Sequence, residues 1–128
     1  MNQENSAILK RDFKWSEEQI QLGLRAKFKC EYCDKDLLSL IDNYKLWQKD
    51  HIIPRSSIIE NFDYESFENL AIACTQCNKD YKGRYNVPEK LGYEKSRSEY
   101  VLHLRKYIVN IKFTKQNELN EMRKYLID

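Results

Sequence analysis

Apolar residues near the start of the chain recur at every fourth position. Ile20, Leu24 and Phe28 follow this spacing behind a Ser-x-x-Gln capping box at Ser16, and the pattern predicts a helix over residues 16–27. The preceding residues, 1–12, are mostly polar and lack such a stripe, so we expect them to be frayed. The first helix therefore leads directly into the first cysteine pair.

The last third of the chain has a second helical stripe. A Ser-x-x-Glu capping box at Ser96 precedes apolar residues at helical spacing and predicts a helix over residues 97–112; these residues are Val101, Leu104, Ile108 and Ile111. Thr114 is expected to cap one more helix, which would carry Leu119, Met122 and Leu126. Residues 85–95 contain Pro88 and Gly92 and are predicted to be a loop.

The middle of the chain has strand-like segments instead. Aromatic and branched residues over 44–53, ended by Pro54, predict one strand, and the apolar run 69–73 predicts a second, buried one. A polar loop, residues 55–67, connects them. For residues 36–43 we expect a short strand or a turn followed by a loop, and for 74–84 a turn that continues as a helix. A chain of 128 residues with this order of elements predicts a single α+β domain.

All four cysteines stand in two C-x-x-C pairs, Cys30 with Cys33 and Cys74 with Cys77. Two such pairs are typical of a single tetrahedral zinc site with four thiolate ligands. A site closed by four protein ligands has no open position, so the zinc is expected to be structural. Thiols of this kind persist in a reducing cytoplasm, and no segment resembles a signal peptide or a membrane span.

The net charge of +2 does not by itself indicate a nucleic-acid-binding protein, but the charge is unevenly distributed. Residues 30–73 carry four Lys or Arg and nine Asp or Glu, whereas residues 74–128 carry twelve and seven. An acidic middle with basic flanks suits a protein that holds a cation against a phosphate backbone. Scattered solvated charge explains the same distribution equally well.

The combined order C-x-x-C, D-H-I-I-P, N-L and C-x-x-C-N resembles the HNH endonucleases, also called ββα-metal or His-Me finger nucleases. The resemblance covers residues 28–84. It implies a ββα-metal core held by the Cys₄ zinc site, with helical flanks at 1–27 and 85–128. It also implies hydrolysis of DNA phosphodiester bonds with one catalytic Mg²⁺ or Mn²⁺.

The resemblance assigns a role to each motif position. His51 matches the general base that takes a proton from the attacking water, and neutral imidazole suits that role. Asp50 and Asn78 match the two oxygen ligands of the divalent metal. Asn69 matches the central asparagine, which orients the histidine.

Two features of this sequence complicate the assignment. The family often places a lysine three residues after the last motif position, but here Tyr81 stands there and Lys82 follows. Candidate contacts to nucleic acid are accordingly Lys82 with Lys79, Arg84 and Arg55. Asp50 and His51 would also point to opposite faces of a regular strand, so both can serve one site only if the strand ends or bulges there.

The resemblance implies an endonuclease that acts on DNA, with double-stranded DNA as the expected partner. A domain of this size would nick one strand, and a homodimer would be needed to cut both. Its place in a larger defence or mobile-element complex is left open by the sequence. A zinc-stabilised nucleic-acid-binding module without catalysis explains the cysteines equally well, but it leaves Asp50, His51 and Asn78 as coincidence.

Overall fold

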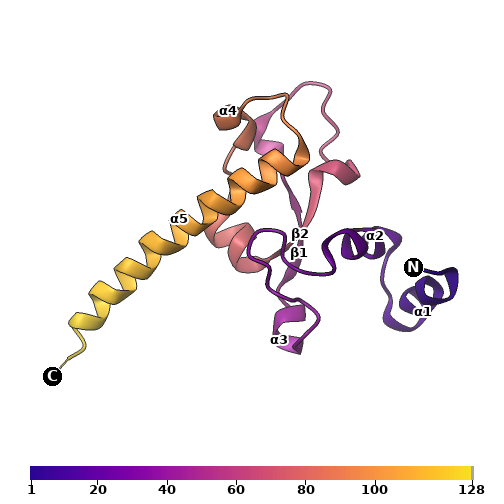
Figure 1. Ribbon diagram of the computed structural model, residues 1–128, viewed down its shortest axis with the longest axis horizontal. Coiled ribbons are helices and arrows are strands. Elements are labelled where there is room, and N and C mark those ends of the chain that lie inside the picture. Colours follow the sequence, from indigo (N-terminus) through magenta and orange to yellow (C-terminus); the bar gives the residue numbers. More distant parts are fainter. Residues whose placement is uncertain (128) are drawn as a thin grey trace.

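The computed structural model describes residues 1–127 and arranges helices around a two-stranded sheet (Figure 1). In chain order the main elements are α1 (Gln3–Phe13), α2 (Glu17–Ala26), α3 (Ile41–Tyr44), β1 (Trp47–His51), β2 (Leu70–Cys74), the π-helix η3 (Gln76–Lys82), α4 (Val87–Leu91) and α5 (Arg97–Lys124). Two short 3₁₀ turns, η1 (Arg55–Ser57) and η2 (Phe67–Asn69), lie between the strands. The predicted α+β class with a ββα core is therefore confirmed.

The two strands form an antiparallel pair in which Trp47 lies opposite Cys74 and His51 lies opposite Leu70. Every residue of β2 is buried, which explains its unbroken apolar sequence, Leu-Ala-Ile-Ala-Cys. In β1 only Asp50 is buried. The sheet thus places one acidic side chain inside the protein, at the end of the strand that leads to His51.

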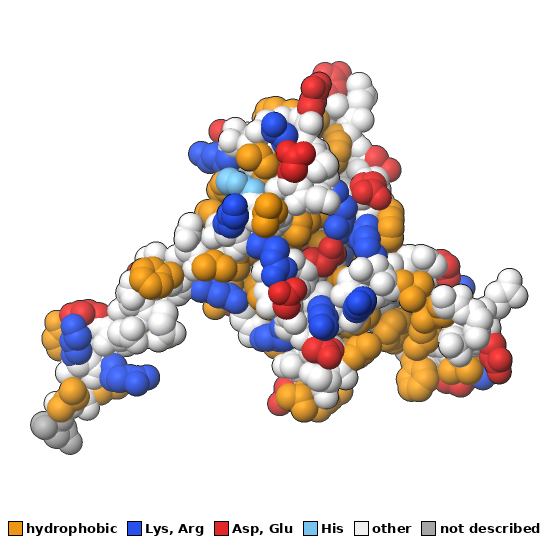
Figure 2. Space-filling view, viewed as in Figure 1, with side chains coloured by type: hydrophobic (Ala, Val, Ile, Leu, Met, Phe, Trp, Pro, Cys, Tyr) orange, Lys and Arg blue, Asp and Glu red, His pale blue; other side chains and the backbone are white. Residues whose placement is uncertain are grey.

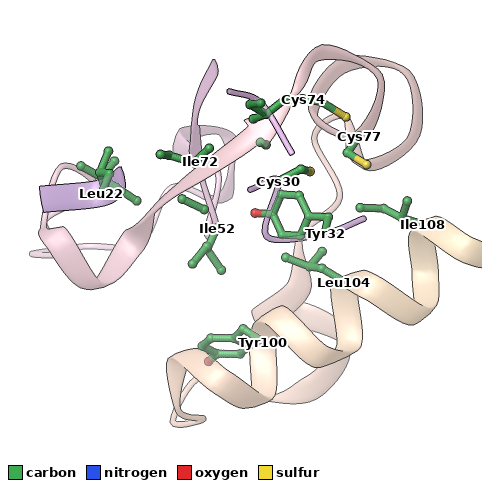
Figure 3. Close-up of a cluster of buried hydrophobic side chains, with 14 of the residues drawn as sticks. Leu22, Cys30, Tyr32, Ile52, Ile72, Cys74, Cys77, Tyr100, Leu104 and Ile108 are labelled. Carbon is green, nitrogen blue, oxygen red and sulfur yellow. The ribbon is translucent and has the colours of Figure 1, made fainter. Parts of the chain in front are cut away.

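The buried side chains join elements from the whole length of the chain. Leu22 of α2, Ile72 of β2 and Leu104 of α5 belong to one hydrophobic cluster, which also contains three of the cysteines, Cys30, Cys74 and Cys77 (Figure 3). The first half of α5 covers the core, whereas its second half extends away from the body of the molecule (Figure 1). The cysteine pairs are therefore built into the main core.

Gly23 interrupts the apolar face of α2 for a steric reason. A Cβ atom at this position would lie 2.8 Å from Cδ2 of Phe28, a residue that is itself almost fully buried. Phe28 also has a left-handed φ of 51°, in the turn between the end of α2 at Ala26 and the first cysteine pair. The glycine permits this close approach.

Several predicted boundaries in the first half of the chain were wrong. Residues 1–12 were expected to be frayed but form most of α1, because Oδ1 of Asn2 caps the helix by accepting a hydrogen bond from the Asn5 N–H. Residues 36–43 form a turn that enters the short helix α3, so the strand expected over 44–53 is shortened to β1. The predicted helix over 16–27 is confirmed as α2, with Ser16 as its N-cap.

Two further differences occur toward the C-terminus. The predicted loop 85–95 contains α4, which Asn86 caps and which has Pro88 in its first turn. The two helices expected after Ser96 are one continuous helix, α5, because no glycine or proline interrupts this segment. Thr114 lies inside α5, where its hydroxyl donates to the Asn110 carbonyl. No helix among residues 1–127 is long and apolar enough to cross a membrane.

Candidate active site and metal centre

The four cysteine sulfur atoms converge at one point. The Sγ atoms of Cys30, Cys33, Cys74 and Cys77 all lie within 4.8 Å of one another, and those of Cys33 and Cys74 are 3.8 Å apart. Ligands at a Zn–S distance of about 2.3 Å in a tetrahedron would be about 3.8 Å apart. The donor set and its spacing fit a zinc ion.

The two cysteine pairs lie in local structures that bring their sulfur atoms together. The first pair lies in a tight turn closed by a 2.9 Å hydrogen bond from the Cys30 N–H to the Lys35 carbonyl, and the second pair lies where β2 enters η3. Hydrogen bonding with Cys30 lowers the pKa of the Cys33 thiol.

Helix α5 ties the first cysteine pair to the core through two arginines. Nη1 of Arg105 donates a 2.7 Å hydrogen bond to the Glu31 carbonyl, and Arg97 forms a 2.9 Å ion pair with the Glu31 carboxylate. Both basic side chains therefore stabilise the fold.

A pocket of about 300 Å³ lies at the end of β1. Its lining residues are Asp50, His51, Pro54, Arg55, Ser56, Lys82, Gly83 and Arg84. His51 is the last residue of β1, and both Asp50 and His51 line the pocket although they are neighbours in the strand. The structure thus brings the predicted metal-binding carboxylate, Asp50, and the predicted general base, His51, to the same pocket.

The Asp50 carboxylate is only 6% exposed and is held by two partners. The Tyr32 hydroxyl donates a 2.6 Å hydrogen bond to Oδ2, and Nζ of Lys82 lies 3.3 Å from the same oxygen. Burial raises the pKa of Tyr32 well above its usual value, and the nearby Asp50 carboxylate raises it further. Tyr32 therefore remains a protonated donor.

The His51 ring contacts a second carboxylate, which comes from the loop between the strands. Its Nε2 atom lies 2.7 Å from Oε1 of Glu65. Glu65 also forms an ion pair with Arg55 and lies 3.6 Å from Nζ of Lys49. The Arg55 guanidinium and then His51 lower the pKa of Glu65 to about 2, so this carboxylate is ionised at neutral pH.

In the described part of the chain the Asn69 side chain forms no hydrogen bond with the His51 ring, but it fixes the backbone at Ile53 and at Tyr64. Its Oδ1 accepts a 2.8 Å hydrogen bond from the Ile53 N–H, and its Nδ2 donates to the carbonyls of Ile53 and Tyr64. Ile53 follows His51 by two residues and Tyr64 precedes Glu65. Buried Asn69 therefore connects the two segments that carry the His51–Glu65 pair.

The π-helix η3 accounts for the displaced lysine. Its wide turn includes a 2.9 Å hydrogen bond from the Gly83 N–H to the Asn78 carbonyl, five residues earlier. This geometry absorbs one extra residue, so Lys82 lies about one turn after Asn78. Asn78 Nδ2 donates a 2.8 Å hydrogen bond to Gln48 Oε1, and Nζ of Lys82 lies 3.3 Å from the Asp50 carboxylate. Gln48 and Asp50 are two positions apart in β1 and therefore lie on the same face of the strand.

The basic residues predicted to contact nucleic acid differ in exposure. Arg55, Lys79 and Arg84 are exposed, and the two arginines line the pocket. Lys82 is buried, and its Nζ donates a 3.0 Å hydrogen bond to the His51 carbonyl besides pairing with Asp50. In this arrangement the ammonium of Lys82 faces the protein interior. On the face shown in Figure 2, basic and acidic side chains are interspersed.

The segment that carries this pocket is similar to a known protein family. Residues 30–84, somewhat less than half of the chain, match the family model described as HNH endonuclease. The chain carries an HNH domain. No curated protein matches the sequence. The HNH match spans both cysteine pairs, both strands and η3, so it includes the whole pocket described above.

Three residues of this site, Gln48, Tyr32 and Glu65, were not predicted from the sequence. Gln48 is two positions before Asp50, so strand alternation alone could have placed it on the same face. Tyr32 lies inside the first cysteine pair, and its contact with Asp50 spans eighteen positions. Glu65 is one of several acidic residues in a polar loop, and only the return of that loop brings it to His51.

The Asp50 carboxylate is an oxygen donor of the kind that a hard divalent cation prefers. The Asp50 carboxylate has lone pairs beyond those used by Tyr32 and Lys82, and it borders the pocket. Mg²⁺ is commonly held by one or two carboxylates together with water molecules. Asp50 therefore fits such an ion, although the ammonium of Lys82 already compensates part of its charge. The second predicted ligand, Asn78, is not among the pocket-lining residues in this arrangement, and its amide group donates to Gln48.

Proposed function

We propose that this chain is a metal-dependent endonuclease that hydrolyses phosphodiester bonds of double-stranded DNA. The observation that carries the proposal is that Asp50 and His51, adjacent in sequence, border one pocket together with the exposed Arg84 and Arg55. A proton acceptor, a metal-binding carboxylate and phosphate-binding cations are the parts that this hydrolysis requires.

In this proposal His51 accepts a proton from the attacking water, which then attacks the phosphorus and releases the 3′-oxygen. Arg55, Lys79 and Arg84 neutralise the DNA backbone and orient the scissile phosphate. Lys82 holds Asp50 in place and fixes the His51 backbone through its carbonyl. Asp50 and Asn78 would hold one Mg²⁺ or Mn²⁺, which supplies charge stabilisation at the leaving oxygen. The expected products end in a 3′-hydroxyl and a 5′-phosphate.

We further propose that the zinc site is structural and that the protein acts in the cytoplasm. Each cysteine sulfur faces the other three, so a bound zinc would have no open position for water. Free thiols in this arrangement suit a reducing compartment. We propose a single HNH domain over 1–128 with its core at about 28–84, because one buried cluster joins α2, β2 and α5, and Trp47 of β1 packs against it. A double-strand cut would require a second copy or a larger defence or mobile-element assembly.

Nicking of supercoiled plasmid tests this function. Wild-type protein should nick DNA with Mg²⁺ or Mn²⁺ and be inactive in EDTA. His51→Ala should keep its fold, zinc and DNA binding, yet lose roughly 10²–10⁴-fold in rate, the usual contribution of a general base. His103→Ala is the matched control, because His103 hydrogen bonds with Tyr85 and lies outside the pocket lining.

Two results would contradict the proposal. Wild-type protein that binds DNA or RNA but cuts neither with these ions would favour the non-catalytic binding module. A His51→Ala variant that cuts as fast as wild type would exclude His51 as the base.

A further inference from the structure

Glu65 is the one carboxylate that contacts the His51 ring among the described residues. It lies in the loop between β1 and β2, and its side chain is 43% exposed. We propose that Glu65 is a positioning residue that holds the proton of neutral His51 on Nε2 and thereby leaves Nδ1 as the nitrogen that accepts a proton. This inference rests on the proposed nuclease function and assigns a residue that the HNH motif does not include.

The contact itself determines the tautomer. Neutral imidazole carries its proton on only one nitrogen, and an ionised carboxylate can accept a hydrogen bond but cannot donate one. A 2.7 Å separation between Nε2 of His51 and Oε1 of Glu65 therefore requires the proton on Nε2. Ionisation of Glu65 at neutral pH agrees with the low pKa caused by Arg55 and His51.

The surrounding contacts fix the Glu65 carboxylate. Arg55 pairs with the same oxygen that faces His51, and Lys49 lies 3.6 Å from the other oxygen. The Glu65 N–H donates a 3.0 Å hydrogen bond to Asp63, and Asn69 holds the preceding carbonyl of Tyr64 at 2.9 Å. Glu65 is thus held by hydrogen bonds to the backbone around it and by ion pairs to its carboxylate.

The same contact supports the proposed reaction. When water gives up its proton to Nδ1, His51 becomes a cation with protons on both nitrogens. The Glu65 carboxylate then lies beside that new charge and stabilises it, without taking the proton itself. A carboxylate behind an imidazole base therefore both selects the nitrogen that reacts and lowers the energy of the charged product.

A simpler role for Glu65 makes a different prediction. The carboxylate could merely neutralise Arg55 and Lys49 when DNA is absent. Its removal would then raise DNA affinity and lower KM, with kcat unchanged. The positioning role predicts instead that removal of the carboxylate lowers kcat.

The tautomer can be measured directly because the chain has only two histidines, His51 and His103. Protein labelled with ¹⁵N-histidine would be studied by NMR at a pH where both rings are neutral, and His103→Gln would identify the His51 signals. We expect the Nε2–H form to dominate at His51 in wild type and to lose population in Glu65→Gln. Glu60→Gln is the matched control, because Glu60 is an exposed acid in the same loop. An Nδ1–H form in wild type, or no change in Glu65→Gln, would overturn the proposal.

Cleavage kinetics provide the second measurement. Glu65→Gln should lower kcat by roughly 10–100-fold, the usual effect of losing a partner that orients a functional histidine. Its zinc content and melting temperature should match those of Glu60→Gln, which should cut like wild type. Unchanged kcat with lower KM would establish the simpler role. Wild-type protein that does not cut would refute the nuclease function alone, since the NMR result stands without activity.

Discussion

The hydroxyl of Tyr32 donates a 2.6 Å hydrogen bond to the carboxylate of Asp50. Tyr32 stands between Cys30 and Cys33, and Asp50 borders the candidate active site. The turn that carries the first cysteine pair therefore contacts the proposed metal-binding carboxylate through Tyr32. This contact connects the part of the molecule that suits a structural zinc to the part that is proposed to do chemistry.

Replacement of Tyr32 tests this connection. Tyr32→Phe keeps the buried ring but removes the donor, so the Asp50 carboxylate loses one of its two partners. We expect a loss of about 1.5–3 kcal/mol in the free energy of unfolding, typical of a hydrogen bond to a charged group. Plasmid cleavage should fall roughly 10–100-fold because the carboxylate is less well oriented. Chemical denaturation and nicking rates measure the two effects.

Tyr93→Phe is the control, because Tyr93 is 62% exposed and lies outside both sites. It should match wild type in stability and rate. The connection would be disproved by a Tyr32→Phe variant with wild-type cleavage and wild-type stability.

Lys82 compensates the charge of Asp50. Loss of this lysine should therefore change how the stability of the protein responds to added divalent ions. Its side chain is 1% exposed, so Lys82→Met would leave a buried carboxylate without its cation. We expect a loss of about 3–5 kcal/mol in stability when no divalent ion is present, as for other broken buried ion pairs. Added Mn²⁺ should raise the melting temperature of this variant more than that of wild type, because the ion would then supply the missing charge.

Thermal melts with increasing Mn²⁺ measure this difference. Lys90→Met serves as the control, because Lys90 is exposed and belongs to α4. Equal Mn²⁺ responses of Lys82→Met and wild type would show that divalent ions do not bind beside Asp50.

The cysteine cluster predicts one zinc ion per chain. Cys74→Ser removes a ligand that is buried at the end of β2, within the main hydrophobic cluster. We expect zinc below one equivalent and loss of the cooperative melt, because structural zinc contributes directly to folding free energy. Metal analysis and circular dichroism measure both quantities. Folded wild-type protein without zinc would contradict the assignment, as would a Cys74→Ser variant that melts like wild type.

Much of this protein could be predicted from local sequence. The capping residues Ser16 and Ser96 and the stripes behind them gave the starts of α2 and α5, because helix caps and periodicity act within a few positions. The two C-x-x-C pairs predicted a common site, which the converging sulfur atoms confirm. The pairing of Asp50 with His51 at one pocket followed from the family resemblance and from the expectation that Pro54 ends the strand.

What the sequence left undecided depends on contacts between distant segments. The sequence contains Tyr32, Glu65 and Lys82, but their partners Asp50 and His51 lie between fourteen and thirty-two positions away. Many acidic, basic and aromatic residues could have made these contacts, and local propensity does not distinguish among them. Pairing of β1 with β2, the return of the loop and the wide turn of η3 determine which ones do. The residues that can carry the chemistry could be identified from sequence motifs, but the side chains that hold them in place could not, because only folding sets the distance between separate segments.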